Sequence, residues 1–268
     1  MNQEKKNNHP RVVLILVDGM RPDGLQRADT PTMDSIIRHG IYTLQARTIF
    51  PSVTLPCHAS LFFSAFPERH GILTNTWVPQ VRPVPNLFDV LNLAGKTVAM
   101  FYNWEGLRDL SPPGSLAVSH MLRVPEPPIN NPDWDLTQAA LQWLTTYDFH
   151  FAFIYLGKTD VVGHSDGWMS APYISSLSQV DKCITNIMKS LPGDTHYIVM
   201  ADHGGHDQIH GTKLDEDMNI PILMTGPRIN QGKNLGDGVS ILDVAPSILQ
   251  ILKVPVPKDW EGKTLLHL

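Results

Sequence analysis

Five short apolar runs of six or seven residues, several of them rich in Val and Ile, constrain the fold of this chain more than any other feature. They cover residues 11–17, 97–102, 150–156, 196–201 and 220–225. Segments with apolar side chains three or four positions apart, as on one face of a helix, occupy residues 32–39, 85–93, 136–147, 173–191 and 244–252. Continuous apolar runs are typical of strands buried on both faces, and their alternation with helices indicates a parallel sheet. We predict a three-layer α/β sandwich with helices on both faces of a mostly parallel central sheet.

The composition fits a single domain over residues 1–268. The chain is 42% hydrophobic and 18% charged, as in ordinary globular proteins, and we find no internal repeat or composition shift. Two proline-rich stretches, residues 78–85 and 111–128, are expected to be loops over the active face rather than linkers or an inserted cap domain. A net charge of −5 gives no basic field for a nucleic-acid backbone, so no binding to a nucleic-acid duplex is expected.

The N-terminal region and the cysteines indicate in which cellular compartment the protein resides. The apolar run at residues 12–17 ends in Asp18 and is too short for a secretory signal or a membrane span. Only two cysteines are present, Cys57 and Cys183, which in a chain of this length are expected to be reduced thiols. We therefore expect a cytoplasmic protein without a membrane partner.

Acidic residues and histidines follow three of the predicted strands. Asp18 ends the first strand, Asp160 and His164 follow the strand at 150–156, and Asp202 and His203 follow the strand at 196–201. Open α/β sheets place their ligand sites at these strand ends. With His206 and His210 shortly after, this set can supply the nitrogen and oxygen ligands of two zinc ions if one more oxygen donor is present.

Thr54 is the candidate for that oxygen donor. It lies in a tight segment, residues 51–58, which follows a strand and precedes an apolar helical stretch at residues 59–65. A hydroxyl at a helix N-terminus lies where backbone N–H groups and the helix dipole favour negative charge. Coordination to a divalent metal would lower the pKa of this hydroxyl and make it a nucleophile.

Each of these residues also has a structural explanation when taken alone. An Asp at a strand end commonly caps a turn, an Asp–His pair four residues apart occurs on many helix surfaces, and a Thr before a helix is commonly a cap. The adjacent pair Asp202 and His203 is more specific, because Gly204 and Gly205 allow the chain to turn so that both side chains reach one metal. The occurrence of the whole set at strand ends favours a metal site.

The chain resembles the alkaline phosphatase superfamily, and within it the nucleotide pyrophosphatase/phosphodiesterase, or type I phosphodiesterase, branch. The resemblance runs nearly from end to end. The motifs that carry it lie at residues 16–19, 30–34, 54–60, 67–72, 159–164, 201–204, 243–247 and 261–265. Cys57 departs from the branch, which commonly has Asn three residues after the nucleophile. The Thr at position 54 argues against a sulfatase, and the absence of a nucleophilic Ser and of a large inserted domain argues against a phosphoglycerate mutase.

The resemblance implies two metal sites and a nucleophile. One zinc is expected on Asp160, His164 and His210, with His206 as the alternative to His210, and the other on Asp18, Asp202, His203 and the oxygen of Thr54. The resemblance also implies that the amide of Asn75 steadies a phosphoryl oxygen.

The predicted function is a two-metal phosphodiesterase or nucleotide pyrophosphatase that acts through a phosphothreonine intermediate. Phosphomonoester or phosphonate hydrolysis at the same site is the first alternative, and a non-catalytic zinc-binding scaffold is the second. The expected partner is a small phosphate ester, for example a nucleotide. Among four aromatic residues that could stack a base, Trp77, Tyr102, Trp104 and Trp168, we expect Trp77 and Trp168 to bind substrate, since both closely follow site motifs. Three cations lie close enough in sequence to contribute: Arg21, Lys158 and Lys213.

Overall fold

The computed structural model describes residues 9–124, 131–229 and 232–266. Its strands are β1 (Arg11–Val17), β2 (Ile41–Arg47), β3 (Val98–Tyr102), β4 (Val118–Met121), β5 (Phe151–Leu156), β6 (Thr195–Met200), β7 (Asn219–Thr225) and β8 (Lys233–Asn234). They form one sheet in the order β4-β3-β5-β1-β6-β7-β2-β8. β7 runs antiparallel to its neighbours β6 and β2, and the remaining pairs are parallel. The predicted mostly parallel α/β fold is confirmed.

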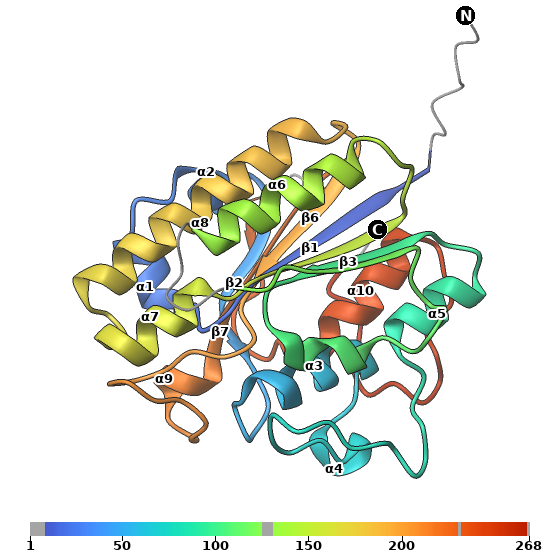
Figure 1. Ribbon diagram of the computed structural model, residues 1–268, viewed down its shortest axis with the longest axis horizontal. Coiled ribbons are helices and arrows are strands. Elements are labelled where there is room, and N and C mark those ends of the chain that lie inside the picture. The colour runs from blue at the N-terminus through green and yellow to red at the C-terminus, as the bar shows by residue number, and fades with distance from the viewer. Residues whose placement is uncertain (1–8, 125–130, 230–231, 267–268) are drawn as a thin grey trace, which may run out of the picture.

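Helices cover both faces of this sheet. Figure 1 shows α2, α6 and α8 packed along one face and α3, α5 and α10 along the other. The helices are α1 (Pro22–Arg27), α2 (Pro31–His39), α3 (Thr54–Phe63), α4 (Pro67–His70), α5 (Leu87–Leu93), α6 (Pro132–Leu144), α7 (Lys158–Asp166), α8 (Ala171–Ser190), α9 (Asp215–Met218) and α10 (Val244–Ile251), with 3-10 helices η1 (Glu105–Leu110) and η2 (Ile241–Asp243).

The central position of β1 brings distant parts of the chain together. Every residue from Val12 to Val17 is fully buried, because β1 lies between β5 and β6 with helices above and below. Val17 is paired with Leu156 of β5, and Leu16 is paired with Met200 of β6. The three strands therefore end at nearly the same level, and the residues that follow them meet at one edge of the sheet.

The strands that the apolar runs did not reveal lie toward the edges of the sheet. β2 alternates buried with partly or fully exposed positions, β4 contains no fully buried residue, and both residues of β8 are exposed. β4 also corrects the expectation that residues 111–128 form only a loop, since it occupies four residues within that stretch. Residues 125–128 of the stretch lie outside the described residues.

Cys57 and Cys183 are both buried and free, as expected for reduced thiols. In the described parts of the chain, no helix has both the length and the apolar character needed to cross a membrane.

Candidate active site

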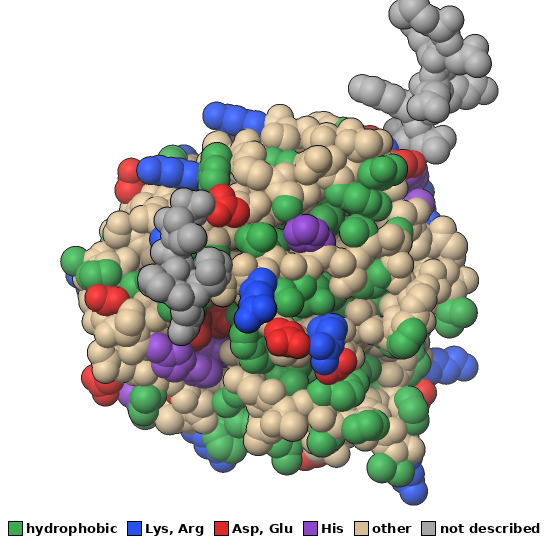
Figure 2. Space-filling view, viewed as in Figure 1, with side chains coloured by type: hydrophobic (Ala, Val, Ile, Leu, Met, Phe, Trp, Pro, Cys, Tyr) green, Lys and Arg blue, Asp and Glu red, His purple; other side chains and the backbone are tan. Residues whose placement is uncertain are grey.

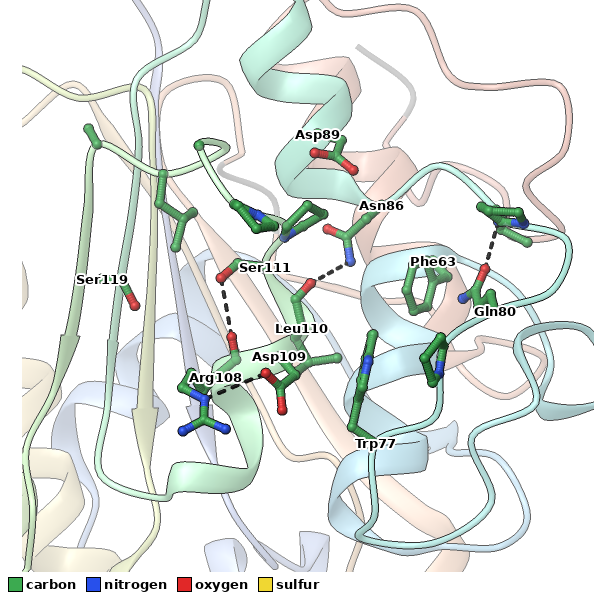
Figure 3. Close-up of a pocket in the computed structure, with 18 of the residues that line it drawn as sticks. Phe63, Trp77, Gln80, Asn86, Asp89, Arg108, Asp109, Leu110, Ser111 and Ser119 are labelled. Carbon is green, nitrogen blue, oxygen red and sulfur yellow. Dashed lines mark hydrogen bonds and ion pairs between the residues drawn. The ribbon is translucent and has the colours of Figure 1, made fainter.

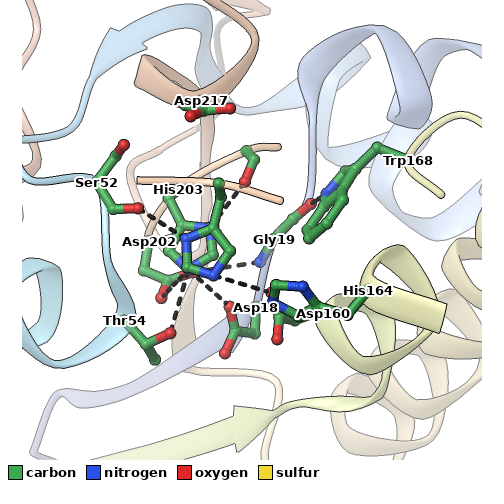
Figure 4. A network of polar contacts seen from close by, with 12 residues as sticks. Asp18, Gly19, Ser52, Thr54, Asp160, His164, Trp168, Asp202, His203 and Asp217 are labelled. Atoms are coloured by element: carbon green, nitrogen blue, oxygen red, sulfur yellow. Dashed lines mark hydrogen bonds and ion pairs between the residues drawn. The ribbon is translucent and has the colours of Figure 1, made fainter. Parts of the chain in front are cut away.

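The polar residues predicted at the strand ends lie together at the edge formed by β5, β1 and β6 (Figure 4). They form two groups in which one ligand atom from each side chain lies within 4.8 Å of the others. The first group is Asp160, His164 and His210, and the second is Asp18, Asp202 and His203. Both groups match the sets that the sequence predicts.

The second group is fully enclosed. His203 Nε2 lies 3.2 Å from Asp18 Oδ1 and 3.5 Å from Asp202 Oδ2. The hydroxyl oxygen of Thr54 is 3.2 Å from the same nitrogen, so the predicted fourth donor stands beside the other three. A donor set of two carboxylates, one imidazole and one hydroxyl suits a divalent cation.

The first group is more open. Asp160 Oδ1 lies 3.5 Å from His164 Nε2 and 3.7 Å from His210 Nε2. Asp160 and His164 are one turn apart on α7, whereas His210 comes from the loop after β6. The rings of His203 and His210 stack with their centroids 3.8 Å apart, so the two donor groups are direct neighbours. Figure 2 shows histidine side chains gathered in one patch on this face of the molecule.

The histidines are oriented by backbone carbonyl groups. His164 Nδ1 lies 2.9 Å from the carbonyl oxygen of Gln208, and His210 Nδ1 lies 2.9 Å from that of Ser52. His203 Nδ1 lies 2.8 Å from the carbonyl oxygen of Gly204. A carbonyl can only accept, so each Nδ1 carries the hydrogen and each Nε2 is left with its lone pair toward the donor group.

The carboxylates are oriented in the same way. Asp18 Oδ2 accepts a hydrogen bond from the hydroxyl of Tyr155, and Asp202 Oδ1 accepts one from the backbone N–H of Gly19. The other oxygens, Asp18 Oδ1 and Asp202 Oδ2, are buried and have no hydrogen-bond partner among the described residues, as is also true of Asp160 Oδ1. Buried unpartnered oxygens are costly, and these three all face the donor groups. The residues present therefore fit two divalent cations.

The pKa shifts of the carboxylates and histidines also fit the binding of two divalent cations. Burial raises the pKa of Asp18 well above its usual value, and the charges of Asp202 and Asp160 raise it further. Burial likewise raises the pKa of Asp202 and lowers that of His203. Burial lowers the pKa of His210 to about 4, and the neighbouring His203 adds to this effect. The protein interior thus disfavours the charged form of each group, a cost that a bound cation would offset for the carboxylates.

Thr54 and Asn75 stand side by side at the start of α3. Thr54 is the first residue of the helix and is 5% exposed, so its hydroxyl has little access to bulk water. Asn75 Oδ1 accepts a hydrogen bond of 2.9 Å from the backbone N–H of Leu55, which holds the Asn75 amide against the start of the helix. Thr54 and Asn75 both line a cavity of about 600 Å³ over the donor groups.

Trp168 does not line this cavity. It is 6% exposed, and its indole N–H donates to the carbonyl of Gly19 at 2.9 Å. A Cβ atom at Gly163 or Gly205 would come within 2.6 Å and 2.3 Å of the ring, so the indole fills the space that these glycines leave. The structure therefore places Trp168 behind the ligands as a packing residue, which corrects its expected position against the substrate.

Trp77 also lies outside the site cavity. It lines a separate cavity of about 730 Å³, between the end of α3 and the loops near residues 79–86 and 108–117 (Figure 3). In that region Asn86 Nδ2 donates to the carbonyl of Leu110 at 3.0 Å. The position of Trp77 therefore differs from the one expected, because proximity in sequence to Asn75 did not bring the ring into the same cavity.

Two residues of the site, Tyr155 and Asn103, are not among those considered from the sequence, and a third, Trp104, was considered for stacking but not chosen. Tyr155 is the penultimate residue of β5, and Asn103 and Trp104 directly follow β3. Of the three cations near the motifs, only Lys158 lines the cavity. Arg21 is bound to Asp23 and to the carbonyl of Gly205, and the ammonium of Lys213 lies over the ring of Phe50. The strand-end rule, applied to β3 as well, would have found Asn103 and would have favoured Trp104 over Trp77 and Trp168.

His206 contacts Asp217 and does not join either donor group. Its Nδ1 lies 2.7 Å from Asp217 Oδ1, and Asp217 Oδ2 accepts hydrogen bonds from the backbone and hydroxyl of Thr212. The structure thus brings His210, and not His206, to Asp160 and His164.

Comparisons with known proteins identify a family and several relatives of this chain. Residues 12–221 match the model of a family described as type I phosphodiesterase / nucleotide pyrophosphatase. The 2,3-bisphosphoglycerate-independent phosphoglycerate mutase of Thermomicrobium roseum is 26% identical over 82% of this chain and 45% of its own length. Ectonucleotide pyrophosphatase/phosphodiesterase family member 3 of Mus musculus is 27% identical over 73% of this chain and 25% of its own length. The chain thus spans less than half the length of these curated relatives.

Solved structures show the same fold. Murine ectonucleotide pyrophosphatase/phosphodiesterase 5, as an inactive threonine-to-alanine variant in complex with AMP, superposes with a TM-score of 0.78 at 17% identity, over 94% of this chain and 98% of that one. A phosphonate monoester hydrolase from Silicibacter pomeroyi has a TM-score of 0.76 at 16% identity, over 96% of this chain and 76% of that one.

Proposed function

The chain belongs to the type I phosphodiesterase/nucleotide pyrophosphatase family of the alkaline phosphatase superfamily, and on this basis we propose that it hydrolyses phosphate esters and that it cleaves phosphodiesters with two zinc ions and a phosphothreonine intermediate. The observation that carries the proposal is the contact between Thr54 and the buried donor group. Its hydroxyl is 3.2 Å from His203 Nε2, the atom that would bind the metal. A threonine placed only as a helix cap has no need of such a position.

We assign the metals to the two donor groups described above. Asp160, His164 and His210 would hold one ion, and Asp18, Asp202, His203 and Thr54 the other. Divalent ions bound there would lower the pKa of the Thr54 hydroxyl and stabilise negative charge on the leaving oxygen. Three carboxylates and two such ions leave a local charge of about +1, so the site attracts an anion although the whole protein is acidic.

The chemistry of the protein groups follows from their positions. The hydroxyl of Thr54 loses its proton to solvent, and its Oγ1 forms a bond to phosphorus while the bond from phosphorus to the leaving oxygen breaks. The leaving group keeps the electron pair of that bond and departs as an alkoxide or phenolate, which solvent can protonate. The Asn75 NH₂ group donates a hydrogen bond to a non-bridging phosphoryl oxygen, where negative charge is stabilised in the transition state. Water then attacks the phosphorus of the phosphothreonine, which still carries the second ester group, and the bond from phosphorus to Thr54 Oγ1 breaks, so that a phosphate monoester is released and the Thr54 hydroxyl is regenerated.

A nucleotide is one substrate that the cavity could hold. Its volume of about 600 Å³ lies in the range of small-molecule sites, and Trp104 offers an aromatic surface along its wall. AMP is bound to the murine structural relative, which has the same fold. The single-domain organisation and the cytoplasmic location expected from the sequence stay predictions.

Hydrolysis of monoesters is the second candidate, and the presence of Lys158 in the cavity favours it. A monoester carries one more negative charge than a diester and is better bound beside an additional cation.

The test compares bis(4-nitrophenyl) phosphate with 4-nitrophenyl phosphate, before and after removal of metal with a chelator and after return of zinc. We expect faster turnover of the diester, loss of turnover with chelator and recovery with zinc. Faster turnover of the monoester would support the second candidate. Absence of turnover in zinc-loaded protein would overturn both.

A further inference from the structure

Asn103 presents a hydrogen-bond acceptor at the wall of the site cavity. It directly follows β3, is half-buried and lines the same cavity as Thr54. Its Nδ2 donates to Oδ1 of the buried Asp133 at 2.8 Å. Asp133 also accepts from the backbone N–H of Lys158, which lies 3.3 Å from Oδ2. Since a carboxylate that receives two N–H groups acts as an acceptor, the NH₂ group of Asn103 faces Asp133 and its carbonyl oxygen faces the other way.

The carbonyl oxygen of Asn103 lies beside two other residues of the cavity wall. A Cβ atom placed on Gly157 would be 3.0 Å from Asn103 Oδ1, 2.8 Å from the ring of Tyr155 and 3.2 Å from its hydroxyl oxygen. Gly157 and Tyr155 both line the cavity, and the glycine leaves that point empty. Among the residues that the structure describes, Asn103 Oδ1 has no hydrogen-bond partner, and it is not enclosed. It is therefore an uncovered acceptor that a ligand can use.

The place of this oxygen limits which part of a substrate can reach it. The Tyr155 hydroxyl beside it is bonded to Asp18, which belongs to the donor group that includes Thr54. The leaving oxygen of an in-line displacement lies on the side of phosphorus opposite Thr54. Asn103 thus faces the ester arm that stays on phosphorus, and the group within its reach is only a few bonds from the phosphorus atom. At that separation a sugar or polyol arm carries hydroxyl groups.

We propose that Asn103 Oδ1 accepts a hydrogen bond from a hydroxyl group on the retained ester arm, so that the protein prefers phosphodiesters of a sugar or polyol. This inference rests on the proposed function and specifies its substrate class. An arm without a hydroxyl displaces water from the amide oxygen and leaves it unpaired, whereas a hydroxyl replaces that hydrogen bond. Asn103 is accordingly a specificity residue and takes no part in bond breaking.

The test compares two chromogenic diesters that release the same 4-nitrophenolate. One is adenosine 5′-(4-nitrophenyl phosphate), and the other is the 2′,3′-dideoxyadenosine compound, which lacks both sugar hydroxyls. In the zinc-loaded wild-type protein we expect kcat/KM to be about fivefold higher for the adenosine compound, as for the gain of one neutral hydrogen bond. Asn103→Leu should bring the ratio of the two kcat/KM values close to one. Asn103→Ser, whose side chain is too short to reach the same point, should do the same.

Asn92→Leu, which replaces an exposed asparagine on α5, is the matched control and should keep the wild-type ratio. Bis(4-nitrophenyl) phosphate carries no hydroxyl, so its kcat/KM should change little in Asn103→Leu. Metal content and melting temperature show whether metal loading and folding are preserved in each variant.

A ratio near one in the wild-type protein would overturn the inference and leave the proposed function intact. A ratio that neither Asn103→Leu nor Asn103→Ser changes would also overturn it, because another residue would then bind the hydroxyl. An equal loss for all three diesters would show that Asn103 acts only by holding Asp133 and the start of α7, which overturns it as well. Failure of the zinc-loaded protein to cleave any of the diesters would instead count against the proposed function.

Discussion

The hydroxyl of Tyr155 donates a hydrogen bond to Oδ2 of Asp18, and this contact leaves the other oxygen, Oδ1, facing His203 in the buried donor group. Removal of the hydroxyl in Tyr155→Phe frees Asp18 to rotate while the ring still fills its place. We expect metal affinity at the second group to fall about 10–100-fold, the range typical for loss of a group that orients a ligand. Titration with zinc in a competing chelator measures this. Tyr197→Phe, on β6 and outside the cavity, is the control, and equal affinities in the two variants would contradict the assignment.

Thr54→Ala removes the proposed nucleophile and leaves the other six donor residues in place. We expect kcat for the diester to fall by at least about 10³-fold, because no other group can form the covalent intermediate. Metal analysis should still find two ions per chain. Thr74→Ala, at an exposed position, serves as the control. A Thr54→Ala protein with near-normal kcat would exclude the phosphothreonine mechanism.

His210→Ala and His206→Ala separate two histidines only four positions apart. His210 completes the first donor group, whereas His206 is bound to Asp217. His210→Ala should therefore retain about one zinc ion per chain after dialysis and His206→Ala about two. Quantitative metal analysis by mass spectrometry distinguishes them. The opposite result would assign His206 as the ligand.

Trp168→Ala tests whether this ring packs or binds substrate. Since the indole is enclosed by Gly19, Gly163 and Gly205, its loss should leave a cavity and lower the free energy of unfolding by about 3–5 kcal/mol. The KM ratio between a nucleoside diester and bis(4-nitrophenyl) phosphate should stay unchanged. Trp134→Ala, at a side chain 40% exposed on α6, is the control for stability. A selective rise in KM for the nucleoside diester would restore the stacking role.

His70 should make the stability of the protein depend on pH. Burial lowers its pKa from 6.5 to about 4 in the folded protein, where Nδ1 accepts from the backbone of Ile72 and Nε2 bonds to Ser60. The unfolded chain binds more protons between these two pH values, so the free energy of unfolding falls as the pH decreases through that window, by about 3 kcal/mol from this residue.

Urea unfolding in chelator, at pH 7 and pH 4.5, measures the effect without a contribution from metal release. His70→Gln should show a smaller loss of stability on acidification than the wild type. His39→Gln, at an exposed position, should behave like the wild type. An unchanged pH dependence in His70→Gln would show that this histidine is not the source.

The parts of the fold that could be predicted are those in which sequence pattern and burial coincide. The five apolar runs correspond to β1, β3, β5, β6 and β7, because strands buried on both faces need apolar side chains at every position. β4 and β8 could not be found in this way, since edge strands expose their side chains. α7 carries the Asp160–His164 pair and has no apolar stripe, so its polar residues hid its helical pattern.

The residues of the candidate site also divide into those that the sequence could place and those that it could not. The donor residues follow strands whose order in the sheet brings their ends together, so their grouping could be expected from the sequence. The aromatic residues could not be placed by proximity along the chain. Trp168 turned inward because three glycines make room for its ring, and Trp77 entered the neighbouring cavity.

The central place of β1 has a consequence for folding. The proposed donors of one metal are residues 18, 54, 202 and 203, so that site can exist only after β1 has been inserted between strands formed more than 130 residues later in the chain. No fragment that ends before β6 can hold that ion as the intact protein would. Metal bound at these proposed donors would stabilise the native arrangement by mass action, so the availability of metal would then also affect the fraction of chains that stay folded.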